Sequence, residues 1–166
     1  MARSAPPVQF YTAGAHAGSD SVGYLMKRVV GSIVCQADRR LDPHGLTSAQ
    51  WGPLLMLKRE GSMPVAELAR GMFIDAGAMT RMLDRLEKKQ FCKRVRSADD
   101  RRVVQVELTP QGEVAIVEVP AVLADVLNAH LAGFSKTEWL ALKGYLQRLA
   151  ANGEALRAAD QASANT

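Results

Sequence analysis

The chain has 166 residues, of which 48% are apolar and 23% charged, and its formal net charge is +4. A chain of this length and composition can bury a substantial core, which excludes wholesale disorder and predicts a soluble globular protein. No apolar run is long enough to cross a membrane, and residues 1–18 lack the apolar stretch of a signal peptide. We expect a cytoplasmic protein with a flexible arm over 1–18 and a flexible tail over 158–166.

The positive charge is concentrated in one part of the sequence. Residues 75–102 hold nine basic and five acidic side chains, a net charge of +4. The other 138 residues therefore carry 12 charges of each sign. A local basic excess of this kind points to an anionic partner for that segment.

The remaining composition excludes several function classes. Cys35 and Cys92 are too few for a disulfide framework and lack metal-ligand spacing. The three histidines are scattered, and no nucleophile, zinc-protease or phosphate-binding motif occurs. We therefore expect no enzyme activity, no metal and no cofactor.

The first expected element is a helix. Apolar residues recur in steps of three and four from Val22 to Leu41, a pattern that predicts one broad apolar face. Residues 42–45, Asp-Pro-His-Gly, end it. This face needs a partner, and the simplest partner is a second copy of the chain, so we assign residues 19–45 to dimerisation.

Three short helices follow. The sequence Thr47-Ser48-Ala49-Gln50 is a capping box that begins the first of them. Pro64 suits the first turn of the second, and Asp75 is the expected N-cap of the third. The third helix should turn four apolar residues inward: Met79, Met82, Leu83 and Leu86.

Two strands and two further helices complete the chain. Phe91–Arg96 and Val103–Leu108 read as strands joined by a polar hairpin loop. Thr109-Pro110 begins a long helix with an expected kink at Pro120, and Ser135–Glu138 is a second capping box. We assign residues 110–157 to C-terminal dimerisation helices, the last of which carries Trp139, Leu142, Leu146 and Leu149 on one face.

This order of elements predicts a mainly α fold with a small β-wing. The expected architecture is a winged helix-turn-helix over residues 46–109, flanked by N- and C-terminal dimerisation helices. In a helix-turn-helix, the second helix of the motif lies in the major groove of double-stranded DNA, with its N-terminal residues against base edges. The basic segment contains that helix and the following hairpin.

The candidate DNA contacts lie on these two elements. On the helix they are Ala76, Ala78, Thr80, Arg81 and Arg85, and at the hairpin tip they are Arg101 and Arg102. Arginine can bond guanine or clamp a phosphate, and small alanines allow close approach and contact with thymine methyl groups. A hairpin tipped with two arginines can enter a minor groove, and Asp100 beside them would hold the wing in shape.

From Leu46 to Gly112 the chain resembles the MarR family of transcriptional regulators. The residues that carry the resemblance are Leu46-Thr47 with Gln50, Glu67-Leu68-Ala69, Thr80–Glu87, Asp100-Arg101-Arg102 and Val106–Gly112, with Leu131–Glu138 near the C-terminus. The resemblance implies a homodimer that binds a pseudo-palindromic operator, commonly as a repressor that a small ligand or thiol oxidation releases. It assigns Thr80, Arg81 and Arg85 to groove or phosphate contacts, and Asp100 with Arg102 to a wing pair. Ala76-Gly77-Ala78 departs from the hydroxyl-bearing residues of many members, so backbone or methyl contacts would replace hydrogen bonds there.

The same resemblance implies an effector pocket between the dimerisation helices and the DNA-binding lobe. In this chain its expected lining is Tyr24, Arg28, Arg39, His44, Trp51 and Met56. Arginine or histidine beside tryptophan suits a small aromatic or phenolic acid as effector.

Two alternatives stay open. A thiol-redox-responsive regulator would use Cys35 or Cys92. For Cys92 two readings stay open: the flanking cations lower the pKa of its thiol, or its side chain fills the first strand of the wing. A helical dimerisation or interaction protein that does not bind DNA would explain the terminal helices. It would leave the wing arginines without a role.

Overall fold

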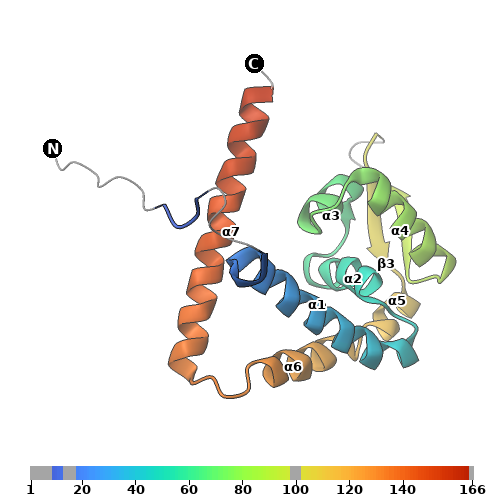
Figure 1. Cartoon of the computed structure of the whole chain (residues 1–166). Helices are drawn as coiled ribbons and strands as arrows, with labels where there is room; N and C mark the ends of the chain where they lie inside the picture. The colour runs from blue at the N-terminus through green and yellow to red at the C-terminus, as the bar shows by residue number, and fades with distance from the viewer. Residues whose placement is uncertain (1–8, 13–17, 98–101, 165–166) are drawn as a thin grey trace. The chain divides into compact units, whose positions relative to one another are not determined.

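The computed structural model describes residues 9–12, 18–97 and 102–164. It forms two compact units, Met1–Val126 and Leu127–Thr166 (Figure 1). The helices are η1 (Gly18–Asp20), α1 (Val22–Leu41), η2 (Asp42–His44), α2 (Ser48–Glu60), α3 (Val65–Gly71), α4 (Ala76–Lys88), α5 (Pro110–Ala115), α6 (Val119–His130) and α7 (Lys136–Ala164). The strands are β1 (Met63–Pro64), β2 (Cys92–Arg96) and β3 (Val104–Leu108). Among the helices of these ranges, none has both the length and the apolar character to span a bilayer.

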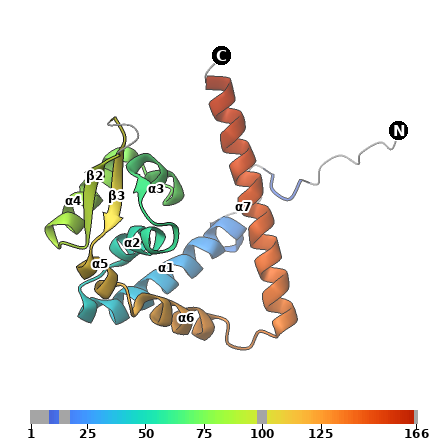
Figure 2. The ribbon, with the colours of Figure 1, turned by 180° about the vertical axis from the view of Figure 1, so that it is seen from behind.

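The core of the first unit lies between α2, α3, α4 and the sheet, which gather together in Figure 2. Its fully buried members include Leu54, Leu57, Leu68, Met79, Leu83, Leu86 and Val106. Ile116 and Val119, from the turn after α5 and the start of α6, belong to the same core. The compact unit therefore extends beyond the domain of residues 46–109 that the sequence suggested.

The sheet has three strands, whereas the sequence predicted a two-stranded hairpin. The order is β1-β3-β2, and all neighbours are antiparallel. Strand β2 pairs with β3 along its whole length, from Cys92 opposite Leu108 to Arg96 opposite Val104. The added strand β1 pairs Met63 with Val106. Two residues are too few to show the alternation of apolar and polar side chains that marks a strand in a sequence. Strand β1 is therefore recognised only by its pairing with β3.

Three of the expected helix caps are confirmed. The side chain of Asp75 accepts a hydrogen bond from the Ala78 N–H at 2.8 Å. The Thr109 hydroxyl accepts one from the Gly112 N–H at 3.0 Å. Before α7, the Ser135 N–H donates to Glu138 Oε2 at 2.8 Å and the Glu138 N–H donates to Ser135 Oγ at 3.2 Å, the reciprocal pattern of a capping box.

The prediction of a capping box at the start of α2 is wrong. Thr47 occupies the N-cap position, but its side chain makes no capping hydrogen bond. Asp38 of α1 takes over this role, because its carboxylate accepts from both the N–H and the hydroxyl of Ser48. Gln50 is engaged elsewhere and accepts from Lys89 Nζ at 3.1 Å.

Two prolines differ from their expected positions. Pro64 is the N-cap of α3 and part of β1, not a residue of the first helical turn. Pro120 is the second residue of α6, so the expected kinked helix is two helices separated at Ile116–Glu118. A proline in the first turn of a helix costs no hydrogen bond, because the N–H groups there have no partner within the helix.

The chain ends also differ in part from expectation. Helix α7 continues to Ala164, so residues 158–164 of the expected flexible tail are helical. Most of the expected arm lies outside the described residues. Its residues 9–12 have no regular secondary structure, and the Tyr11 hydroxyl accepts a hydrogen bond from the Val22 N–H at 3.0 Å.

Candidate nucleic-acid interface

Helix α4 separates its apolar and polar residues as the sequence predicts. Met79, Leu83 and Leu86 are buried, and Met82 is partly buried. Four of the five candidate contact residues on this helix are exposed, namely Ala76, Thr80, Arg81 and Arg85. The fifth, Ala78, is half-buried. One face of α4 is thus available to a partner along its length.

The N-terminus of α4 is held by Asp75. The hydrogen bond from the Ala78 N–H lowers the pKa of the Asp75 carboxyl below its ordinary value, and the positive charge of Arg81 adds to this effect. The Thr80 hydroxyl donates to the Ala76 carbonyl oxygen at 2.8 Å. Its oxygen still has acceptor capacity, because a hydroxyl can donate and accept at once.

The basic residues of the segment 75–102 fall into two groups. Lys89 donates to the Gly45 carbonyl at 2.7 Å, and Lys93 pairs with Glu107 across the hairpin at 3.2 Å. By contrast, the side chains of Arg81, Arg85 and Lys88 make no hydrogen bond or ion pair within the part of the chain that the structure describes. These three side chains form a cationic row on α4, and exposed cations that form no ion pair or hydrogen bond are suited to phosphate or base contacts.

Arg94 on β2 belongs to the first group and donates four hydrogen bonds within the described residues, three through its guanidinium and one through its backbone N–H. Its Nη1 donates to Asp84 Oδ1 and to Glu87 Oε2, each at 2.7 Å. Its Nη2 donates to the Thr80 carbonyl oxygen at 2.9 Å, and its backbone N–H donates to Glu87 Oε1 at 2.7 Å. Arg94 therefore joins the wing to α4.

Sequence reasoning missed this contact and counted Arg94 with the DNA-facing charge. The sequence of α4 held a partial signal for a cation bound along one helix face. Thr80, Asp84 and Glu87 follow one another at intervals of four and three, so they lie on the same face. That spacing matches Lys88 and Arg81 as partners of Asp84 equally well. Only the placement of β2 beside α4 decides for Arg94.

The wing carries the remaining candidates. The Ser97 N–H donates to the Val103 carbonyl at 3.0 Å and continues the hairpin beyond β2 and β3. Arg102 is exposed beside this pair. Arg101 and Asp100 lie outside the described residues, so the expected wing pair between Asp100 and Arg102 stays a prediction.

The six residues expected around an effector have different environments in the structure. Tyr24, Arg28, Arg39 and His44 are exposed on α1 and η2. Trp51 packs against the core, and within the described chain its buried indole N–H has no hydrogen-bond partner. Met56 packs against α3, where a Cβ at Gly71 would stand 2.2 Å from its terminal methyl group.

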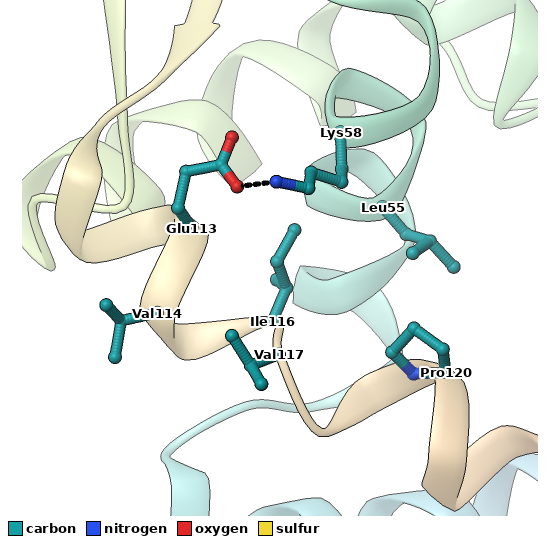
Figure 3. A pocket seen from close by; sticks show the side chains of 7 residues that line it. All are labelled: Leu55, Lys58, Glu113, Val114, Ile116, Val117 and Pro120. Carbon is teal, nitrogen blue, oxygen red and sulfur yellow. Dashed lines mark hydrogen bonds and ion pairs between the residues drawn. The ribbon is translucent and has the colours of Figure 1, made fainter.

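A hollow of about 390 Å³ lies instead between α2, α5 and the start of α6 (Figure 3). Its lining is mostly apolar and comprises Leu55, Lys58, Glu113, Val114, Ile116, Val117 and Pro120. Lys58 and Glu113 form an ion pair across one side of it. None of the six expected effector residues lines this hollow. The sequence did not predict the hollow, because its walls come from segments that meet only in the folded chain.

The two cysteines have different environments. Cys35 on α1 is exposed, whereas Cys92 is buried. Burial raises the pKa of the Cys92 thiol to about 11, and the Glu87 carboxylate adds to this rise. The sequence-based expectation of a lowered pKa is wrong, because Arg94 directs its charge to the acids of α4 and desolvation dominates at the sulfur. No cluster of metal-ligating side chains occurs among the described residues.

The arrangement defines a class of protein. A basic helix follows a short helix and a turn, and it is braced by a hairpin that carries an exposed arginine beside its tip. This is the winged helix-turn-helix of a protein that binds double-stranded DNA.

Comparisons with known proteins identify the family. The model of the MarR family matches residues 46–104. The chain is 33% identical to the HTH-type transcriptional repressor MdtR of Bacillus subtilis (strain 168), over 69% of this chain and 74% of MdtR. A probable transcriptional regulator from Pseudomonas aeruginosa has a similar structure, with 29% identity and a TM-score of 0.69 over 78% of this chain and 97% of that one. A mutant MarR from E. coli in complex with operator DNA has 26% identity and a TM-score of 0.72, over 77% of this chain and 92% of that one.

The chain therefore belongs to the MarR family. It is a DNA-binding transcriptional regulator and not an enzyme. This excludes the alternative of a helical interaction protein that does not bind DNA.

Proposed function

We propose that the chain is a repressor that acts as a homodimer on a pseudo-palindromic operator. The cationic row of α4, formed by Arg81, Arg85 and Lys88, is the observation that carries the proposal. These side chains are exposed and make no ion pair among the described residues, so they are available to phosphates and base edges. The repressor MdtR supports the direction of regulation. A DNA partner also fits the expected cytoplasmic location.

Exposed apolar side chains support the homodimer. Helix α7 carries Trp139, Leu140, Leu142, Tyr145, Leu146 and Leu149, each at least 36% exposed. Helix α1 separately exposes Val22, Leu25, Met26, Val29 and Val30. Contiguous apolar faces of this kind mark an interaction surface, and a second copy of the chain is the partner that is always present.

The operator follows from the symmetry. Two copies related by a two-fold axis present two α4 helices, so each half-site should repeat in inverted orientation about one helical turn, ~10 base pairs, from the other. The wing residues Arg101 and Arg102 would add minor-groove or phosphate contacts beside each half-site. Repression would follow from occupation of promoter DNA.

Selection of duplexes from a random-sequence pool, followed by footprinting, tests the proposal. We expect an inverted repeat protected on both strands, bound by two chains per duplex. Arg81→Ala, Arg85→Ala and Arg102→Ala should each weaken binding about tenfold and reduce the salt dependence. Arg59→Ala serves as the control, because Arg59 pairs with its neighbour Glu60 at the end of α2, outside α4 and the wing. Binding of single strands only, or equal effects in all four variants, would refute the proposal.

We also propose that a small aromatic or phenolic acid is the effector and that it binds the hollow at α2 and α5. Apolar walls suit an aromatic ring, and a carboxylate ligand would compete with Glu113 for the Lys58 ammonium. Calorimetric titration with benzoate and hydroxybenzoates tests this proposal. Lys58→Met should abolish the heat of binding, whereas Lys143→Met on α7 should leave it unchanged. Equal binding by both variants would place the effector elsewhere.

A thiol response through Cys35 is the competing mode of regulation. Its exposure on α1 permits oxidation, whereas the buried Cys92 is a poor candidate. Peroxide treatment of Cys35→Ser distinguishes the two modes. If the variant loses a release from DNA that the wild type shows, Cys35 is the sensor.

A further inference from the structure

Helix α4 carries acidic residues as well as its cationic row. Asp84 and Glu87 lie on α4, with exposed side-chain fractions of 50% and 31%. Asp84 is three residues after Arg81 and four before Lys88, the two spacings at which side chains on a helix form ion pairs. An unengaged Asp84 would therefore draw these cations away from DNA and would itself repel phosphates.

Arg94 prevents both effects in this structure. Its guanidinium bonds the carboxylates of Asp84 and Glu87 at 2.7 Å each and is itself only 25% exposed. Arg94 engages the Asp84 carboxylate through Oδ1, and Arg81 and Lys88 form no ion pair within the described residues. The guanidinium also bonds the Thr80 carbonyl on the same helix face, which fixes its position.

We propose that Arg94 is a positioning residue for DNA binding that acts through Asp84. It is not itself a DNA contact. Its role is to neutralise and sequester the acids of α4, so that the cationic row faces the DNA with its full charge. The inference rests on the proposed function, because it needs α4 to be the helix that approaches DNA.

The test is a double-mutant cycle in the full-length protein. The four members are the wild type, Arg94→Gln, Asp84→Asn and the double variant, each titrated with a fluorescent duplex that the wild type has selected from a random-sequence pool. Arg94→Gln should weaken binding about tenfold, because Asp84 is released toward Arg81 and Lys88. The double variant should recover to within about threefold of the wild type, although it lacks the Arg94–Asp84 contact altogether.

The neighbour on the same strand is a matched control. Lys93→Gln removes the same unit of charge and breaks the ion pair with Glu107, which does not involve α4. We expect it to change affinity by less than about threefold. A loss equal to that of Arg94→Gln would show a general charge effect and would overturn the proposal.

The acid side gives a test that leaves Arg94 in place. Asp84→Asn alone should change affinity by less than about threefold, because Arg94 already neutralises the carboxylate. A tenfold gain, or a double variant as weak as Arg94→Gln, would overturn the inference. Failure of the wild type to bind any duplex, or no effect of Arg81→Ala and Arg85→Ala, would instead refute the proposed function. Circular dichroism and thermal unfolding of each variant show whether the compared proteins are folded. If Arg94→Gln does not fold, the affinity of Asp84→Asn still tests the inference.

Discussion

Gly112 lies so close to Phe91 that a Cβ at position 112 would stand 1.8 Å from the Phe91 carbonyl oxygen. The same carbonyl accepts a hydrogen bond from the Thr109 N–H at 3.1 Å, and the Thr109 hydroxyl donates to the Gln90 carbonyl. These contacts join the start of α5 to the junction between α4 and β2. The segment Thr109–Gly112 thus begins α5 and also holds it against the junction between α4 and β2.

Gly112→Ala should be strongly destabilising for this reason. The methyl group would meet the Phe91 backbone, which no side-chain rotation can move away, so we expect the free energy of unfolding to fall by about 3 kcal/mol. Urea denaturation followed by circular dichroism measures it. Gly31→Ala in α1, where a Cβ would meet nothing within 4 Å, is the matched control and should be neutral or stabilising. Equal effects of the two changes would contradict the close approach.

Phe73, in the turn before α4, has a left-handed backbone conformation with φ of 55° and a side chain that is 69% exposed. Such a conformation costs a non-glycine residue about 1–2 kcal/mol, and an exposed ring recovers little of this through burial. Phe73→Gly should therefore raise the free energy of unfolding by about 0.5–1 kcal/mol. Phe73→Ala keeps the strained backbone and should show no gain. Stabilisation by both variants in thermal unfolding would mean that the ring, and not the backbone, is unfavourable.

The cap of α4 makes stability depend on pH. Hydrogen bonding to the Ala78 N–H and the charge of Arg81 hold the pKa of Asp75 below its ordinary value of 3.8 in the folded chain. The stabilisation is therefore present above the unfolded value and is lost as pH falls through the folded pKa. Asp75→Asn keeps the acceptor and removes the charge, so the wild type should exceed it in stability at pH 7. The difference should shrink progressively as pH falls below 3.8 in urea denaturation, and a constant difference would exclude the titration of Asp75 as its source.

Cys92 should be unreactive in the native protein. The residue is 2% exposed and burial raises the pKa of its thiol to about 11, so almost no thiolate exists at pH 8. In a Cys35→Ser variant, labelling with a chromogenic disulfide reagent should be slow and should become rapid in denaturing urea. Rapid labelling of the folded variant would show that β2 opens readily and would restore Cys92 as a redox candidate.

Features that depend on neighbouring residues were predictable from the sequence. The bounds of α1, the inward face of α4 and the caps at Asp75, Thr109 and Ser135 were all predictable, because a cap or a helical period involves groups only three or four residues apart. The arrangement of short helices, hairpin and terminal helices followed from these elements.

The choice among several equally spaced partners for a polar group depends on how distant elements pack. The Asp38 carboxylate replaces the Thr47 side chain as the cap of α2. Asp84 pairs with Arg94 and not with Arg81 or Lys88. Strand β1 likewise exists because β3 lies beside it. In each case the competing contacts are equally compatible with the local sequence, and the packing of elements distant in the chain selects among them. The net charge alone could not distinguish Arg81 and Arg85, whose side chains make no ion pair within the described residues, from Arg94, which bonds Asp84 and Glu87.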